Sequence, residues 1–539
     1  MNLRTWLISI LALAFLIRIA GVSYGLPLWL VDDEPPFVLA ALKMLELKTL
    51  LPALHFADFK TVLYYPPYLA YLYLPFFAAL AAVKFLFYKG AANLFAAYLL
   101  SDLSGFFIIA RVINILLGVA SVYLIYKIAK NIFTDETPAL FTAFFVSTSL
   151  IHTALSMTSR HWLSVFFFSA LTLFWLSHQK VSDKKRYLLA ALSAGVGVGF
   201  AITNILSALL IVFWYLLYEK KSILGLLKEK FFYGLCALFA VLAMLPYLLY
   251  PGSLGFRADT TESAAKTVRG LISSPFYFAK TIAASEFVLI AFATAGLAFA
   301  FKKSRGVFWA FAAFICAYSV IFYLIFRFEP RFFMGILPIF IILAGYGFYE
   351  TQKKMSSAAL SKSLMILLLL PLIFSLRLGW LALKNDSRTM ARSWAEANLP
   401  AGAKIITLAR LTRFSTNKSA VDEQRKIDSS SLRKVDLADA ELGRPNFHAL
   451  NLFDANNQNF YENLENYVKE NNYEYVIIQP NYRNGQYFKK AMGNGKLIKT
   501  FGSGESDMSV AESQFLKNPL ALFQIKEFGP KIEIYKLNR

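Results

Sequence analysis

Three consecutive carboxylates, Asp32, Asp33 and Glu34, are followed by two prolines near the start of a chain that is otherwise poor in charge. Such neighbours repel one another, and a carboxylate at a membrane surface is costly to bury unless it is paired or solvated. One interpretation is a solvated acidic flank. The other, with equal weight on these residues alone, is a general base beside a membrane-embedded substrate. The three carboxylates are also oxygen ligands that a divalent cation could use.

A second candidate site contains two arginines, Arg327 and Arg331, which enclose Glu329 and have phenylalanine neighbours. Two guanidinium groups at the mouth of two helices can grip a phosphate through bidentate hydrogen bonds. The alternative is that they snorkel to lipid headgroups. A carboxylate cluster and a basic clamp on one face together suggest chemistry on a phosphate-linked substrate. Further candidates, in the first large loop or near the ends of apolar segments, are Lys60, Tyr65, Arg111, Arg160 and His161.

These residues belong to a chain with the composition of a membrane protein. Of its 539 residues, 57% are hydrophobic and 17% are charged, and the mean hydropathy is +0.50. An ordinary soluble domain is about 45–50% apolar and ~25% charged. The composition therefore excludes a soluble enzyme and predicts a polytopic α-helical membrane protein. About 11 spans are predicted, near residues 5–24, 106–126, 139–158, 162–178, 187–202, 204–218, 231–250, 286–303, 306–326, 332–349 and 363–383.

The density of charge changes near Lys384. Residues 1–383 contain 32 Lys and Arg and 16 Asp and Glu, whereas the much shorter remainder contains 23 and 18. We therefore predict a membrane-embedded domain over residues 1–383 and a soluble domain over residues 384–539. The formal net charge of +21 could indicate nucleic acid, but most of it lies in short loops between apolar runs. Anionic lipid headgroups are the expected partner, and nucleic acid is not.

The basic loops predict the orientation in the membrane. Four clusters lie between predicted spans, at residues 180–186, 220–230, 302–305 and 353–362. The positive-inside rule puts all four in the cytoplasm, in agreement with alternation of the spans. The N-terminus is then cytoplasmic and the C-terminal domain extracytoplasmic, in a protein of the inner or plasma membrane. In this scheme residues 23–105 form one external loop.

That loop contains an apolar stretch, residues 66–88, which is long enough to span. A single crossing there would put the four basic clusters outside, so we expect helices that lie in the interface or re-enter. The alternative is a hairpin of two crossings.

The C-terminal domain has the pattern of an α/β fold. Helices are expected over residues 387–398 and 460–471, and strands over residues 404–408, 475–479 and 531–535. His448, the only histidine in this part of the chain, is expected at the surface. The domain has no metal-ligand spacing, glycine-rich phosphate loop or nucleophile motif.

The order of several short motifs resembles that of a known superfamily. Asp33-Glu34 follows the first span, and Tyr65-Pro66-Pro67-Tyr68-Leu69 comes later in the same loop. Ala110-Arg111-Val112-Ile113 then opens a span, and Arg331-Phe332-Phe333 leads to Pro338 much later. Over roughly residues 5–350 this order is similar to that of the lipid-carrier-dependent GT-C glycosyltransferases. The likeness is to the branch of the protein O-mannosyltransferases and aminoarabinose transferases.

The resemblance implies a polyprenyl-phosphate or dolichyl-phosphate sugar as donor, with transfer outside the cytoplasm. It implies that Asp33 is the catalytic base, that Glu34 takes the neighbouring position, and that Arg331 contacts the donor phosphate. No cofactor is then required, although a divalent cation is not excluded. Arg327 and Lys60 are further candidates for binding the donor phosphate. The candidates that would support the site are Asp32, Tyr65, Arg111, Arg160, His161 and Glu329.

Two positions depart from the family pattern. Tyr65 stands where a basic residue or His often precedes the two prolines. Arg160 and His161 stand where an acidic residue is common near the end of the third span. These departures leave the identity of the donor sugar and of the acceptor open.

The predicted activity is transfer of a sugar from a lipid-linked donor to an acceptor hydroxyl or phosphate, with inversion at the anomeric carbon. A transporter or flippase for lipids or glycans would also be polytopic and basic. It would usually show internal repeats and broken midplane helices, and the sequence indicates neither. A non-catalytic membrane receptor would need neither Asp33 nor Arg331.

Overall fold

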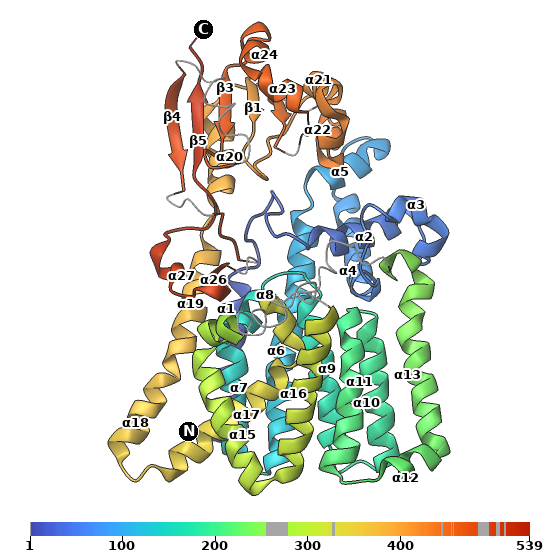
Figure 1. Ribbon diagram of the computed structural model, residues 1–539. Coiled ribbons are helices and arrows are strands. Elements are labelled where there is room, and N and C mark those ends of the chain that lie inside the picture. Colours follow the sequence, from blue (N-terminus) through green and yellow to red (C-terminus); the bar gives the residue numbers. More distant parts are fainter. Residues whose placement is uncertain are drawn as a thin grey trace.

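The computed structural model describes residues 2–254, 279–325, 329–443, 446–453, 455, 457–482, 495–502, 507–510 and 514–538. Arg327, one of the predicted phosphate ligands, lies outside the described residues. Figure 1 shows helices running side by side in a bundle, a region with a β-sheet at one end of the bundle, and a layer of shorter helices between the two.

The bundle is formed by the apolar segments, and each predicted span contains at least one helix. Among the described residues, five helices are long and apolar enough to cross a membrane, or up to seven if each bent pair counts as one span. This number is below the predicted 11 because other bundle helices, such as α9 and α10 with 16 residues each, are short. The helices are α1 Leu3–Ile19, α6 Ser104–Phe133, α7 Glu136–Thr148, α8 Leu150–Ser156, α9 Trp162–Ser177, α10 Asp183–Val198, α11 Ser207–Phe213, α12 Ile223–Lys228, α13 Lys230–Leu249, α15 Phe287–Lys303, α16 Arg305–Ile325, α17 Leu337–Lys354, α18 Ala358–Leu367 and α19 Leu369–Leu383.

The pair α7–α8 bends by 57° at Ser149, and the side chains of Arg18 and Glu286 bind the backbone at the bend. Arg18 of α1 donates hydrogen bonds to the carbonyl oxygens of Val146 and Ser147, at 3.0 and 3.1 Å. Glu286 accepts the backbone N–H of Ile151 at 2.9 Å. A broken helix leaves peptide groups without partners, and an apolar bundle offers them no water. Arg18 and Glu286 therefore stabilise the bend, beyond which α8 leads into residues 157–161.

The layer between the bundle and the sheet is made by the loop that follows α1. It contains α2 Pro35–Leu47, α3 Phe56–Phe59, α4 Tyr68–Leu86 and α5 Phe95–Ser101. By length and composition alone α4 could cross a membrane. Figure 1 shows it beside α2 at the end of the bundle nearest the sheet. The interfacial placement of residues 66–88 stays a prediction.

The C-terminal region contains a five-stranded sheet in the order β2-β1-β3-β5-β4. The first three of these strands are parallel, and β5 is antiparallel to β3 and β4. The strands are β1 Lys404–Thr407, β2 His448–Asn451, β3 Tyr475–Ile478, β4 Lys496–Phe501 and β5 Ile532–Lys536. The helices are α20 Ser387–Asn398, α21 Lys418–Asp428, α22 Lys434–Glu441, α23 Gln458–Glu462, α24 Leu464–Glu470, α26 Gln514–Lys517 and α27 Ala521–Gln524.

The expected helix over residues 387–398 and the three expected strands are confirmed by α20, β1, β3 and β5. The second expected helix is divided at Asn463 into α23 and α24. The expectation for His448 was wrong: this residue is in β2, is 9% exposed, and its Nε2 lies 2.7 Å from a Glu423 oxygen. Its hydrogen bond to Glu423 of α21 replaces the water that the ring loses on burial.

Candidate active site

The loop after α1 separates its three carboxylates by giving each a different basic partner. Asp32 pairs with Arg410 of the C-terminal region at 3.0 Å. Asp33 pairs with Arg160 at 3.0 Å and with Arg331 at 3.5 Å. Glu34 pairs with Arg111 of α6. The mutual repulsion expected of three adjacent carboxylates is therefore offset by arginines from four different parts of the chain.

Glu34 is the most firmly held of the three. Its two oxygens accept hydrogen bonds from Nε and Nη2 of Arg111, at 3.0 and 2.7 Å, and both side chains have 0% exposure. The backbone N–H of Ser159 also donates to Glu34, at 2.6 Å. Arg111 further donates to the carbonyl oxygens of Val22 and Tyr24. This geometry anchors the loop on α6 and does not favour a reacting role for Glu34.

Asp33 is held less tightly than Glu34 and keeps 27% of its side chain exposed. Its backbone has a φ of +66°, a left-handed conformation that is uncommon outside glycine and must be held by the surroundings. Arg160 and Arg331 both approach its Oδ2, and no described residue donates a hydrogen bond to Oδ1. Burial raises the pKa of Asp33, but the charges of Arg160 and Arg331 outweigh burial and hold the pKa below its usual value. The carboxylate is ionised at neutral pH, and it is partly exposed.

Aromatic rings enclose the Asp33 cluster on one side. The ring of His161 lies 4.6 Å from that of Tyr65 and 4.5 Å from that of Trp162. The guanidinium of Arg331 lies over Trp162, with its central carbon 5.6 Å from the ring centre. Burial lowers the pKa of His161 to about 3, so this histidine is neutral at physiological pH. It adds no positive charge for a phosphate, and the rings lower the local dielectric constant.

Several buried polar atoms around Asp33 have no hydrogen-bond partner among the described residues. They are Nε of Arg331, Nδ1 of His161, Nε1 of Trp162 and Oγ of Ser159. A buried polar group without a partner costs about 1–3 kcal/mol. Such atoms gathered beside two arginines and one carboxylate suit a polar, anionic ligand.

The remaining predicted residues have separate places. Asp32 is half exposed and turned toward the C-terminal region. Glu329 acts on Arg331 through its charge. Lys60 is exposed at the end of α3, and no contact joins it to the Asp33 cluster among the described residues. No group of three or more His, Cys, Asp or Glu side chains among the described residues is arranged to hold a metal ion.

The structure adds residues to the site that do not stand out in the sequence. Asn114 of α6 donates to the carbonyl oxygens of Thr158 and Arg160, at 2.7 and 3.0 Å, and so fixes the segment that carries Arg160. Trp162 directly follows Arg160 and His161. Its place beside two candidate residues is the signal that could have identified it. Nothing in the sequence around Arg410 distinguishes it from other arginines of the C-terminal region.

Comparison with known proteins gives a family match over part of the chain and a shared fold over most of it. Residues 92–250 match the family model described as dolichyl-phosphate-mannose-protein mannosyltransferase. No curated protein matches the chain. The apo structure of ArnT from Cupriavidus metallidurans is 11% identical, with 92% of this chain and 96% of that one covered and a TM-score of 0.51.

Two further solved structures match with TM-scores below that of apo ArnT. ArnT from the same organism bound to undecaprenyl phosphate is 14% identical, with 71% and 67% of the two chains covered and a TM-score of 0.48. The Archaeoglobus fulgidus oligosaccharyltransferase in complex with Zn and sulfate is 13% identical, with 90% and 69% covered and a TM-score of 0.48.

The family match and the fold shared with ArnT confirm the predicted polytopic membrane architecture and the predicted resemblance. The chain is an integral membrane protein with the fold of ArnT, and residues 92–250 match the family model of the dolichyl-phosphate-mannose-protein mannosyltransferases.

Proposed function

We propose that the protein transfers a sugar from a polyprenyl-phosphate or dolichyl-phosphate donor to an acceptor hydroxyl or phosphate on the extracytoplasmic face. The observation that carries the proposal is Asp33, partly exposed, beside Arg160 and Arg331 and among buried polar atoms that lack partners. The family description names a dolichyl-phosphate sugar, and ArnT was crystallised with undecaprenyl phosphate. Both support a lipid phosphate as the group that the arginines bind.

In the proposed reaction Asp33 is the general base and Arg331 holds the donor phosphate. The acceptor O–H gives its proton to Oδ1 of Asp33 while its oxygen forms a bond to the anomeric carbon. The bond between this carbon and the phosphate oxygen breaks, and the lipid phosphate leaves with the electron pair. The guanidinium groups of Arg331 and Arg160 stabilise the charge that develops on the leaving phosphate. A single displacement of this kind inverts the anomeric configuration.

The contact between Arg331 and Asp33 couples donor binding to the strength of the base. In the free protein the two arginines lower the pKa of Asp33, which keeps it ionised but makes it a weak base. A donor phosphate on the same arginines would offset their charge. The pKa of Asp33 then rises when the donor is bound, and its affinity for the acceptor proton rises with it.

The proposed sidedness follows from the basic loops: a cytoplasmic N-terminus and cytoplasmic clusters, with residues 384–539 as an extracytoplasmic domain on the membrane-embedded residues 1–383. Single cysteines at Ser182, Ser304 and Ser429 test it, after replacement of Cys236 and Cys316, which are both exposed. In sealed cells a membrane-impermeant maleimide should label only the Ser429 position. Labelling of Ser182 or Ser304 from outside would invert the scheme.

The activity is tested by incubating the purified protein with polyprenyl-phosphate sugars labelled in the sugar, and with membrane extracts as the acceptor source. The wild type should move label to a product, and Asp33→Asn should not. If label crosses the bilayer of proteoliposomes while the sugar–phosphate bond stays intact, the protein is a transporter. The same donor panel identifies the sugar.

A further inference from the structure

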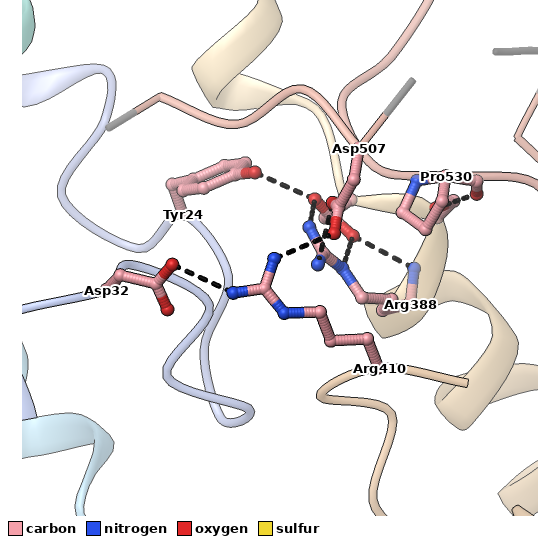
Figure 2. Close-up of polar contacts among 8 residues, drawn as sticks. Tyr24, Asp32, Arg388, Arg410, Asp507 and Pro530 are labelled. Atoms are coloured by element: carbon pink, nitrogen blue, oxygen red, sulfur yellow. Dashed lines mark hydrogen bonds and ion pairs between the residues drawn. The ribbon is translucent and has the colours of Figure 1, made fainter. Parts of the chain in front are cut away.

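A chain of charged side chains joins the active-site loop to the C-terminal region at two points (Figure 2). At the first, Arg410 contacts Asp32 at 3.0 Å and Asp507 at 3.3 Å. Asp507 in turn pairs with Arg388 of α20 at 2.9 Å. At the second point, Tyr24 donates a hydrogen bond of 2.7 Å to Asp386, which also pairs with Arg388.

The two points differ in burial, and therefore in the part they play. Tyr24, Asp386 and Arg388 are fully or almost fully buried, so this contact holds the C-terminal region against the loop. The pair of Arg410 and Asp32 is half exposed, with 35% and 49% of the side chains accessible. Exposed ion pairs contribute little to stability. We therefore expect the buried contact to keep the C-terminal region docked when Arg410 is substituted.

The contact of Arg410 with Asp32 affects Asp33 because the two aspartates are adjacent in the loop. The preceding residue, Asp32, is held by Arg410, and the following residue, Glu34, is held by Arg111. Asp33 lies between these two anchors with its φ at +66°. A left-handed residue that is not glycine relaxes when one flanking anchor is lost.

We propose that Arg410 is a positioning residue: by holding Asp32 it fixes the backbone at Asp33 and so lets the C-terminal region set the rate of sugar transfer. This inference rests on the proposed function, in which Asp33 is the base. It gives the C-terminal region a part in turnover that does not depend on contact with the substrate. A displacement of a reacting group by about 1 Å can reduce a rate up to about 100-fold.

The test uses the full-length protein and the labelled-donor assay. Arg410→Ala should lower kcat about tenfold without changing the KM for the donor, since the phosphate is held by other arginines. Asp32→Ala should give a similar loss. The double variant should lose about tenfold, because both substitutions remove the same contact, and Arg410→Lys should restore most of the rate.

The matched control is Arg425→Ala. Arg425 is an exposed arginine of α21 whose described ion pair is with Asp422 on the same helix, so its loss should leave kcat unchanged. Thermal unfolding midpoints of all variants should agree with that of the wild type. If Arg410→Ala keeps its rate, or if the two single losses multiply in the double variant, the inference is wrong.

Asp33→Asn, measured in parallel, separates this inference from the proposed function. An active Asp33→Asn protein overturns both. An inactive Asp33→Asn protein beside a fully active Arg410→Ala protein overturns only the role of Arg410.

Discussion

Asp33 and Glu423 are two carboxylates with nearly equal side-chain exposure, 27% and 24%, and both have a lowered pKa. Their partners differ in kind. Glu423 of α21 accepts hydrogen bonds from Tyr467 and Tyr473 and pairs with His448, all inside the C-terminal region. Asp33 has two arginines on one oxygen and no donor on the other among the described residues.

The difference shows what separates a structural carboxylate from a candidate base of the same exposure. Burial raises the pKa of Glu423, and hydrogen bonds from His448, Tyr467 and Tyr473 lower it to about 2. Those donors belong to the fold and are already used by it. The partners of Asp33 are charges that an incoming phosphate can share. The pKa of Asp33 can therefore respond to a ligand, whereas that of Glu423 is fixed.

The largest expected effect is on turnover. Asp33→Asn should lower kcat by about 10²–10⁴-fold, because an amide cannot take the acceptor proton. Glu423→Gln should leave kcat within about threefold of the wild type. The labelled-donor assay measures both, and donor binding by Asp33→Asn serves as the control for folding. A large loss in Glu423→Gln with an intact fold would contradict the comparison.

Arg331→Ala should have the second-largest effect. It removes charge-assisted hydrogen bonds worth about 1.5–3 kcal/mol, so kcat/KM for the donor should fall roughly 10- to 100-fold. Arg331→Lys should lose less, since it keeps the charge but not the bidentate fork. The loss should be the same for every acceptor supplied. A changed acceptor preference with normal donor kinetics would place Arg331 on the acceptor side.

A smaller effect is expected on the stability of the C-terminal region. The pKa of Glu423 is about 2 in the fold and lies near 4.5 without it. The ionised Glu423 therefore stabilises this region above pH 4.5, and the contribution, about 1–2 kcal/mol, is lost as the pH falls from 4.5 toward 2. Hydrogen exchange in peptides from α21 and β2 should become faster between pH 6 and pH 3, after correction for the intrinsic rate. Glu423→Gln should remove that dependence, and peptides from α20 are the control.

The smallest expected effect is a difference between two pH profiles. The acidic limb of kcat/KM reports the free protein, in which the arginines hold the pKa of Asp33 low. The acidic limb of kcat reports the donor complex, in which the donor phosphate should offset the charge of the arginines beside Asp33. The kcat limb should therefore lie at the higher pH, and Arg331→Ala should reduce the gap. Coinciding limbs would show that donor binding does not change the base.

Individual candidate residues of this site can be selected from the sequence, whereas the contacts between them cannot. Asp33 and Arg331 stand out because charge is rare in apolar surroundings. Their pairing was not predictable, because it depends on how η8, residues Pro330–Gly335, packs against the loop after α1. Glu34 is also a carboxylate that could act as a base, and it directly follows Asp33 in the sequence. Its pairing with Arg111, 77 residues later in the chain, leaves it fully buried.

In the C-terminal region, local signals predicted α20, whose N-cap is Asp386, and the strands with alternating or apolar runs. They did not predict β4, an edge strand whose side chains are mostly exposed and whose sequence Lys496–Phe501 is rich in lysine. Edge strands form through their partner, here β5, and need no apolar face of their own.

The bend between α7 and α8 has a consequence for the order in which the protein can be assembled. Arg18, which binds the α7 side of the bend, has left the ribosome long before residues 146–147. Glu286, which binds the α8 side, is synthesised 135 residues after Ile151. A nascent chain that ends before residue 286 therefore holds this broken helix with only one of its two side-chain partners. The candidate active site, which needs Arg160 beyond this bend, is therefore completed late in biogenesis, although Asp33 is among the first residues made.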